Sequence, residues 1–357
     1  MQHKLMKILL LLFLPLTLFG LYVIGVLLYG TFTNYKPKEI TPLSTQNQIE
    51  NIPPKDTFTF LTWNVGAAGL GAEMDFFYEG GQMVRPKRTW VDKYLKGINE
   101  TLENFKEEAD FILLQEVDFD SKRSYFIHLY DNFAGILNEY SNTFALNFKV
   151  KYLPAPLLST SPLGKVNSGL ASFSKYKVSE SVRYQFPGTF PWPKNLFLLK
   201  RCFLAQRIPL KNNKELIVIN SHNSAYDDGS IRKEQMEYLR NFIVEEYSKG
   251  NYVVVGADWN MCPPNFDCQD MEIDANVPIL QMSIDENLLP ADWQWVFDDT
   301  YPTNRKMSTP YKKGETFTTL IDFYLVSPNI SVLDVETINQ DFKYSDHHPV
   351  KLKIQLK

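Results

Sequence analysis

The sequence predicts an α/β fold in which β-sheets pack against one another and helices lie on their outer faces. Short runs rich in β-branched and aromatic residues outnumber the helical patterns and do not alternate strictly with them, which argues against a simple doubly wound sheet. Residues 350–356 alternate apolar and polar side chains and are therefore predicted to form a half-buried strand. With 357 residues, of which 44% are hydrophobic, the chain can bury a sizeable core.

Periodicity and end signals place the other elements. Helical spacing of apolar side chains predicts one helix within residues 86–108. A second helix is expected to begin at Ser230, a plausible N-cap, and to close at Gly250. Strands are predicted at residues 58–64, 111–114, 216–219, 253–255 and 321–326.

The N-terminal segment is typical of a membrane anchor. Lys4 and Lys7 precede an uncharged run from Ile8 to about Gly30, and about 20 apolar residues suffice to span a bilayer. A secretory signal has a shorter apolar region and a small-residue cleavage site, which this run lacks. We therefore interpret residues 1–30 as a signal anchor, with a cleaved signal as the alternative.

The charge distribution around this segment predicts its orientation. Positive charge at the N-terminal end favours a cytoplasmic position for that end, so the rest of the chain is expected on the extracytoplasmic side of a single-pass membrane protein. Residues 31–56 are rich in Thr, Asn, Pro, Lys and Gln and are predicted to form a linker. The folded domain is expected to cover residues 57–357.

Composition narrows the classes of partner. The formal net charge is -4, so the chain as a whole lacks the basic surface that proteins gripping long nucleic acids usually show. No protein partner is indicated. The three cysteines, Cys202, Cys262 and Cys268, form no CxxC motif. Cys262 and Cys268 are either bridged across a short loop or free thiols, and Cys202 is expected to be buried.

Several apolar runs end on a side chain suited to metal binding or acid–base chemistry. These residues are Asn64, Glu116, His222 and Asp258, with Asn260 two residues further on; Asp346 and His347 directly precede the last strand. Such strand ends are where α/β folds place their sites. Carboxylate and amide oxygens suit Mg²⁺ or Mn²⁺. Taken singly, each residue also has a plain structural reading as a solvated loop residue, a turn former or a core histidine.

Asp322 is the carboxylate that is hardest to explain structurally. It lies in the apolar stretch TLIDFYL (residues 319–325), which is expected to be buried. A buried carboxylate needs a partner, and histidine is the natural one because a carboxylate fixes the imidazole tautomer and stabilises its charged form.

These motifs together resemble the endonuclease/exonuclease/phosphatase superfamily, whose fold is similar to deoxyribonuclease I. The resemblance covers about residues 57–357, and the ordered combination of QE, GxDxN and SDHxP makes it specific. The matching stretches are TWNVG (62–66), LLQEVD (113–118), SGLASFSKY (168–176), INSHN (219–223), VVGADWN (254–260), LIDFYLV (320–326) and SDHHP (345–349).

The resemblance implies a fold and a metal site. The implied fold is a four-layer α/β sandwich, with two packed mixed β-sheets flanked by helices. Glu116 would bind the divalent cation, Mg²⁺ or Mn²⁺, with Asn64 nearby and Asp346 contributing. The implied activity is hydrolysis of phosphate esters, in which the cation neutralises phosphate charge.

The resemblance also implies catalytic roles. His347 would be the general base that activates water, and Asp322 would orient it. His222 would bind the scissile phosphate and stabilise developing charge, while Asp258 and Asn260 would orient the nucleophile and the phosphate. His347 is preferred to His348 as the base because the family histidine directly follows the aspartate.

The phosphate ester itself is less well defined by the sequence. Gly66 stands where DNA-repair members of the family carry an aspartate, and SGLASFSKY is more similar to the sphingomyelinase branch. A lipid headgroup or a small phosphate ester is therefore expected, with a nuclease as the alternative and an inactive binding module as the third reading. The aromatic segment 184–199 either lines the substrate site or lies buried beneath the sheets.

Overall fold

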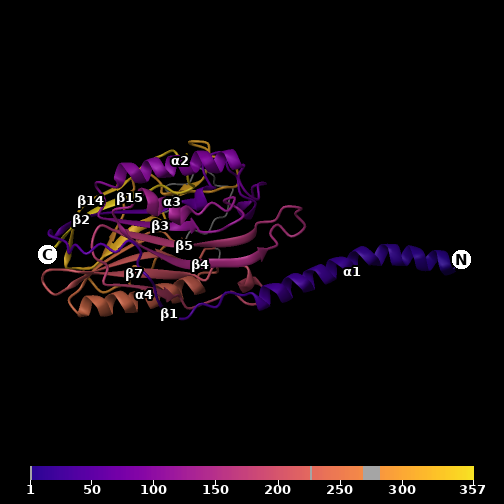
Figure 1. Cartoon of the computed structure of the whole chain (residues 1–357), viewed down its shortest axis with the longest axis horizontal. Helices are drawn as coiled ribbons and strands as arrows, with labels where there is room; N and C mark the ends of the chain where they lie inside the picture. Colours follow the sequence, from indigo (N-terminus) through magenta and orange to yellow (C-terminus); the bar gives the residue numbers. More distant parts are fainter. Residues whose placement is uncertain (1, 226, 268–281) are drawn as a thin grey trace.

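Two mixed β-sheets form the centre of the folded domain (Figure 1). The computed structural model describes residues 2–225, 227–267 and 282–357. Within these residues, one sheet has seven strands in the order β1 (Ile40–Pro42), β6 (Glu180–Gln185), β7 (Cys202–Pro209), β8 (Glu215–His222), β9 (Tyr252–Asp258), β13 (Asp322–Val326) and β10 (Gln294–Val296). Strands β8 and β9 are parallel, and the other neighbours are antiparallel.

The second sheet is also mixed. In the described part of the chain it has six strands, in the order β14 (Ile330–Thr337), β15 (Val350–Leu356), β2 (Thr57–Asn64), β3 (Phe111–Asp118), β5 (Gly164–Ser174) and β4 (Ser141–Leu153). Strands β2 and β3 are its parallel pair. A short ribbon of β11 (Asn304–Arg305) and β12 (Thr318–Thr319) lies apart from both sheets.

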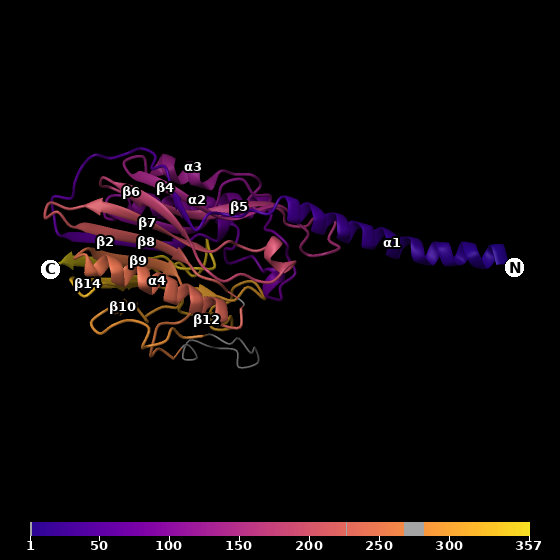
Figure 2. The same ribbon diagram turned by 90° about the horizontal axis from the view of Figure 1, so that it is seen from below.

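Helices cover the outer faces of the two sheets (Figures 1 and 2). The longer helices of the domain are α2 (Arg88–Phe105), α3 (Leu129–Ile136) and α4 (Ser230–Ser248). Single 3₁₀ turns lie at η1 (Gly66–Ala68), η2 (Phe77–Glu79) and η3 (Lys194–Leu196).

Three apolar cores correspond to the three contacts between four layers. The inner core joins the sheets, with Phe60 and Leu113 from one and Val254 and Tyr324 from the other. The second core lies between the β2–β3–β5 face and helices α2 and α3, and the third between the β7–β8–β9 face and α4. Because strands buried on both faces carry continuous apolar runs, β2, β3, β8 and β9 could be predicted from sequence. The expected four-layer sandwich is confirmed.

The N-terminal helix extends away from the domain (Figure 1). Helix α1 runs from Gln2 to Phe32, and the described stretch Phe13–Phe32 is long and apolar enough to cross a membrane, a test that a signal sequence also passes. Part of the segment assigned as a linker is attached to the domain: β1 pairs with β6, and Gln46 pairs with Asn142. The polar composition of residues 31–56 gave no sign of this edge strand, because its partner lies far along the chain.

The start of α4 differs from the prediction. The residue before the first helical turn is Gly229, whose left-handed φ of 95° suits glycine, so Ser230 is the first helical residue and not the N-cap. The carboxylates of Asp227 and Asp228 accept the backbone N–H groups of Arg232 and Ser230 in its place. The predicted end at Gly250 is confirmed by its φ of 83° and its bond to Tyr247. Cys202 is buried, as expected, whereas Cys268 lies outside the described residues.

Glu246 of α4 and Arg207 of β7 form a buried ion pair, whose contribution to the stability of the fold can be tested. Glu246 is 2% exposed and accepts two hydrogen bonds from Arg207, at 2.7 and 3.0 Å, and one from Asn251 at 2.9 Å. Burial opposes its ionisation, but these bonds outweigh burial and lower the pKa of Glu246 to about 2. Because the folded-state pKa lies below the unfolded value, the contribution is present above about pH 4.5 and is lost as the pH falls toward 2.

Replacing Glu246 by glutamine should therefore destabilise the fold by about 1–3 kcal/mol at pH 7. Thermal unfolding of the full chain measures this effect, and the difference from wild type should shrink as the pH falls below about 4.5. The exposed neighbour Glu245, replaced in the same way, is the matched control. Equal melting temperatures for Glu246→Gln and wild type at pH 7 would contradict the argument.

Candidate active site

The predicted site residues gather at one end of the two sheets. Asn64 is the last residue of β2, and His222 and Asp258 end the parallel strands β8 and β9 at paired positions. Asp322 begins β13 opposite Asp258, because those strands are antiparallel. The loop before β15 brings His347 to the same end, where its Nε2 lies 3.5 Å from the Asn64 amide. Strand ends of both sheets thus form one polar site.

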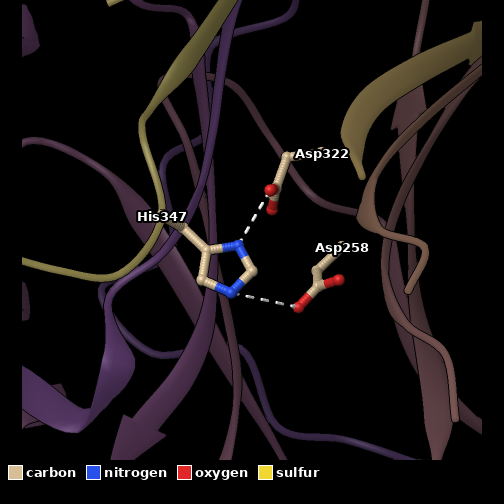
Figure 3. A group of neighbouring side chains, drawn as sticks. All are labelled: Asp258, Asp322 and His347. Atoms are coloured by element: carbon tan, nitrogen blue, oxygen red, sulfur yellow. Dashed lines mark hydrogen bonds and ion pairs between the residues drawn. The ribbon is translucent and has the colours of Figure 1, made fainter. Parts of the chain in front are cut away.

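His347 and Asp322 form a buried hydrogen-bonded pair (Figure 3). His347 Nδ1 donates to Asp322 Oδ2 at 2.8 Å, and both side chains are buried. The backbone N–H of Asp322 donates to Thr303 Oγ1 at 3.0 Å, which fixes the start of β13. With its Nδ1 proton directed to Asp322, His347 presents Nε2 as a proton acceptor, 3.0 Å from the amide nitrogen of Asn304.

The surrounding carboxylates make His347 a strong base. Burial alone would disfavour the imidazolium, but the charges of Asp322, Asp258 and Asp346 outweigh burial and raise the pKa of His347 well above its usual value. Burial raises the pKa of Asp322 to about 6, against the opposing effect of His347. The proton of this pair is therefore shared between two groups whose ionisation depends on each other.

Replacing Asp322 by asparagine should shift the pH dependence of hydrolysis. The Asp322 carboxylate raises the pKa of His347, so its removal should lower that pKa and move the acidic limb of the kcat/KM profile to lower pH. The rate should also fall, because the tautomer is no longer fixed. The exposed Asp334, changed to asparagine, provides the control. An acidic limb that stays in place would show that Asp322 does not act through His347.

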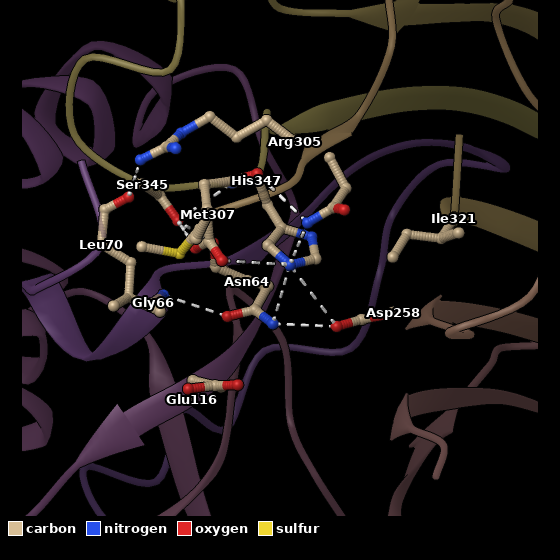
Figure 4. A network of polar contacts seen from close by, with 12 residues as sticks. Asn64, Gly66, Leu70, Glu116, Asp258, Arg305, Met307, Ile321, Ser345 and His347 are labelled. Carbon is tan, nitrogen blue, oxygen red and sulfur yellow. Dashed lines mark hydrogen bonds and ion pairs between the residues drawn. The ribbon is translucent and has the colours of Figure 1, made fainter. Parts of the chain in front are cut away.

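Asp258 is the centre of a second set of contacts (Figure 4). Its Oδ2 accepts a hydrogen bond from Asn64 Nδ2 at 2.9 Å and lies 3.2 Å from His222 Nε2 and 3.9 Å from His347 Nε2. Its Oδ1 accepts the backbone N–H of Asn260 at 3.0 Å. Asn260 has a positive φ of 51° and donates its side-chain amide to a backbone carbonyl, so it shapes the turn after β9 as well as lying beside Asp258.

His222 is a neutral imidazole in this arrangement. Burial lowers its pKa well below the usual value, and the positive charge of Arg201 lowers it further. With Nε2–H directed to Asp258, the buried Nδ1 has no hydrogen-bond partner among the described residues. A bound phosphate anion would oppose these effects and favour the protonated form, which could then donate from Nδ1.

Glu116 occupies a bulge in β3. The register with β5 shifts between Leu114 and Val117, and Glu116 has a φ of 53°, which is strained for a residue with a side chain. The sequence predicts this strand over residues 111–114, and it extends to Asp118, with Glu116 at the bulge between Leu114 and Val117. Arg123 contacts Glu116 at 3.3 Å, and although burial opposes it, this charge helps lower the pKa of Glu116.

Asp346 lies against Gly66, close to Asn64. A Cβ on Gly66 would come within 2.8 Å of Asp346 Oδ1 and 3.1 Å of Ser345 Oγ, and Gly66 has a φ of +51°. The Gly66 N–H donates to Asn64 Oδ1 at 3.0 Å, so glycine at this position lets Asn64 and Asp346 approach one another. The pKa of Asp346 is raised to about 7. Burial is the largest cause and the charge of Glu116 adds to it, while the charge of His347 opposes both.

Two groups of side chains could hold a divalent cation. The first group comprises the oxygen donors Glu116, Asp346 and Asn64 around Gly66. The second comprises Asp258, Asp322 and His347, whose donor atoms lie within 4.8 Å of one another. All of the first group's donors are hard oxygens of the kind that Mg²⁺ and Mn²⁺ prefer, whereas the second group includes the imidazole nitrogen already bonded to Asp322.

A small recess of about 20 Å³ lies beside the first of these groups. Gly66 and Arg123 line it on the side of the site. The rest of its lining is largely apolar and includes Leu70, Met74, Phe76, Val84, Pro86 and Leu163, together with Arg85. The recess is about the size of one water molecule, and its lining places two guanidinium groups beside apolar side chains next to the site.

Three residues of the site were missed by sequence reasoning. Arg123 does not directly follow a strand, and its position depends on the fold of the turn after β3. Thr303 precedes the two-residue strand β11 and Asn304 begins it, and a strand this short has no periodicity signal. The neighbouring histidine lies elsewhere: His348 stacks on Phe342 at 3.9 Å, and burial lowers its pKa to about 4. The preference for His347 over His348 therefore agrees with the geometry.

The site thus combines a buried Asp–His pair, a set of oxygen donors and an adjoining recess. The Endonuclease/Exonuclease/phosphatase family matches residues 61–347, and the chain belongs to this family of phosphoric ester hydrolases. Members of the family generally depend on a divalent metal. No curated protein matches the chain in sequence.

Solved structures share the fold at low sequence identity. An endonuclease/exonuclease/phosphatase from Beutenbergia cavernae is 18% identical with a TM-score of 0.55, over 85% of this chain and 72% of that one. The human Nocturnin catalytic domain with bound sulfate is 17% identical with a TM-score of 0.52, over 86% and 97% of the two chains. ANGEL2, a 2′,3′-cyclic phosphatase, is 14% identical with a TM-score of 0.52, over 90% and 99%.

Proposed function

We propose that the chain is a divalent-metal-dependent phosphodiesterase or phosphatase, anchored in a membrane by α1 with its domain on the extracytoplasmic side. The observation that carries the activity is the buried His347–Asp322 pair, in which Nε2 of the imidazole lies 3.9 Å from Asp258 and 4.0 Å from Asp346. The observation that supports the anchor is the apolar stretch Phe13–Phe32, which the domain leaves almost uncovered.

Glu116, Asp346 and Asn64 are the residues that would hold Mg²⁺ or Mn²⁺. Their arrangement fits a cation, because the charge of Glu116 raises the pKa of the buried Asp346 and a cation would offset that repulsion, and because Gly66 places no side chain between Asn64 and Asp346. When bound, the cation supplies Lewis-acid neutralisation of the phosphate charge.

His347 would take a proton from the attacking water at Nε2. The water oxygen then forms the new bond to phosphorus, the ester P–O bond on the opposite side breaks, and the departing alkoxide is protonated. Asp322 stabilises the imidazolium that forms, because its carboxylate already accepts the Nδ1 proton. Asp258, which lies 3.9 Å from Nε2 and is hydrogen-bonded to Asn64, would orient the water together with Asn64.

The charged form of the phosphate would be stabilised by side chains around the recess. His222 gains a proton-donating Nδ1 when a phosphate anion favours its protonation, and Arg123 lies at the edge of the recess beside Glu116. Asn260 helps by holding Asp258 in place through its backbone N–H. These side chains would bind the phosphate group and not its alcohol substituent. They therefore do not determine which phosphate ester is the substrate.

A nuclease is the second candidate, and one local feature favours it. Arg85 and Arg88 both stack on the ring of Tyr125 at 5.6 Å, and Lys87 stacks on Trp90, so a basic group lies next to the recess in spite of the acidic chain. A solved structure of similar fold, D. rerio TDP2, was determined with single-strand DNA product. A lipid or small phosphate ester remains the first candidate because of the apolar recess and α1.

A substrate panel tests these alternatives. The full chain should hydrolyse at least one phosphate ester among a phospholipid, a soluble diester, single-stranded DNA and RNA. For a nucleic acid substrate, binding should weaken steeply with salt, whereas a single small phosphate group should be much less sensitive. Steep salt dependence together with DNA cleavage would place the chain among the nucleases, and binding without any cleavage would indicate an inactive binding module.

A further inference from the structure

The N-terminal helix and one β-hairpin lie side by side along part of their length. Tyr22 of α1 and Tyr152 of β4 are hydrogen-bonded through their hydroxyl groups at 3.1 Å. Near the end of the helix, the Gly30 backbone packs on the Phe197 ring, and Trp192 donates a hydrogen bond to Thr31. Tyr22 lies about 15 Å along the helix from Phe32, so the contact with the hairpin extends well down α1.

This hairpin projects past the active site. In β5, Ser168 pairs with Asp118 on one side and with Phe148 of β4 on the other, which is the level of the site. Beyond that level, β4 and β5 pair with each other as far as Leu153 and Gly164, and the loop after β3 stays bonded to β5 as far as Lys165, whose carbonyl accepts the Lys122 N–H at 2.8 Å. Figure 1 shows the hairpin and α1 at the same end of the domain, opposite the C-terminus, and Figure 2 agrees.

The tip of the hairpin, residues 154–163, has the composition of a membrane-inserting loop. No charged residue lies between Lys151 and Lys165, and the tip reads PAPLLSTSPL. Leu157 is 48% exposed and Leu158 is 81% exposed. At the base of the tip, Lys122 donates to the Pro162 carbonyl at 3.0 Å and Arg85 donates to Ser161 at 2.9 Å. The exposed Leu157 and Leu158 lie at the far end, and exposed leucines ahead of basic side chains are typical of a surface that enters a bilayer.

The apolar surface continues from the tip to the recess. Leu153 and Leu163 at the base of the tip pack in one cluster with Phe76, Val84 and Phe197. Phe76, Val84 and Leu163 also line the recess beside Gly66 and Arg123. The tip is therefore packed against the same apolar side chains that lie beside the site.

We propose that the tip, residues 154–163, enters the same bilayer that α1 crosses, and that the substrate is a phosphate ester carried by a lipid of that bilayer. This inference rests on the proposed function. Lys149, which lies over the Tyr35 ring at 5.7 Å, and Lys151 would then lie at the level of the lipid phosphates. Insertion of the tip would hold the active site at the level of the lipid headgroups. A flexible tether to the membrane would not fix the active site at that level.

The test uses the full chain reconstituted in vesicles of phosphatidylcholine and phosphatidylglycerol with Mg²⁺. The double variant Leu157→Asp, Leu158→Asp makes the tip polar, while α1 keeps every variant in the membrane. Leu333→Asp changes an equally exposed leucine on β14 and is the matched control. Release of headgroup or phosphate from the vesicle lipids is compared with hydrolysis of soluble bis(p-nitrophenyl) phosphate.

The tip variant should lose at least about tenfold of its lipid hydrolysis and keep its activity on the soluble ester, while Leu333→Asp keeps both. Unchanged lipid hydrolysis in the tip variant overturns the inference, and so does an equal loss on both substrates, which would assign the tip a structural role or another partner such as a second copy. A wild-type chain that cleaves the soluble ester and no lipid overturns this inference alone. A chain that cleaves neither ester, nor any other member of the substrate panel, removes the proposed function itself.

Discussion

Replacing His347 by alanine should lower kcat by about 10²–10⁴-fold while leaving the fold intact. The imidazole is the proton acceptor of the reaction, and its Nδ1 contact to Asp322 lies at the site end of β13, outside the three apolar cores. The rate should be measured with a soluble phosphodiester at saturating Mg²⁺, and the fold by circular dichroism and thermal unfolding.

Two further measurements separate a catalytic role from a structural one. Added imidazole should restore part of the activity of His347→Ala, because a free base can replace the missing side chain, and should not affect wild type. His128, exposed at the start of α3 and paired with Asp131, is the control for removal of a histidine from an Asp–His contact. A His347→Ala variant with near-normal activity would show that another group is the base.

Replacing Glu116 by glutamine should weaken Mg²⁺ or Mn²⁺ binding by at least about 100-fold. Loss of groups that merely orient metal ligands already costs 10–100-fold in affinity, and Glu116 is proposed to bind the cation directly. The strained backbone at Glu116 supports a functional role, because a bulge with φ of 53° is retained where an ordinary strand residue would avoid it. Titration of hydrolysis with metal, and of Mn²⁺ binding by electron paramagnetic resonance, measures the effect.

The same titration discriminates between the two candidate cation groups. Asp258→Asn removes a carboxylate of the second group and should reduce the rate with little change in metal affinity. Glu103→Gln, on the exposed face of α2, serves as the control for a lost carboxylate. If Asp258→Asn weakens Mn²⁺ binding and Glu116→Gln does not, the cation belongs between Asp258, Asp322 and His347.

The strand ends of the site could be predicted because local sequence determines them. Asn64, His222 and Asp258 each follow a continuous apolar run, and parallel strands such as β8 and β9 place their carboxyl ends at one edge. Asp322 could be singled out because burying a carboxylate without a partner is costly, so a carboxylate within an apolar run needs one. The pairing of Asp322 with His347 joins residues 25 positions apart; its chemistry could be inferred from the residue types, whereas its distance depends on the fold.

Other features depend on contacts that no local pattern encodes. The bulge at Glu116 arises from the register between β3 and β5, so it is set by pairing and not by propensity. Asn304 reaches His347 from a two-residue strand. The edge strand β1 forms because residues 40–42 meet β6, and the contact of α1 with β4 depends on how far the hairpin extends. None of these has a periodicity that could be read beforehand.

Hydrolysis of bis(p-nitrophenyl) phosphate by the full chain in ¹⁸O-labelled water, with Mg²⁺ and after its removal by EDTA, tests the central claim most directly. Activation of water by His347 at a metal site predicts that the label enters the phosphate product, that EDTA abolishes the reaction, and that added Mg²⁺ or Mn²⁺ restores it. Label in the alcohol product, or hydrolysis that continues at the same rate in EDTA, would contradict the account.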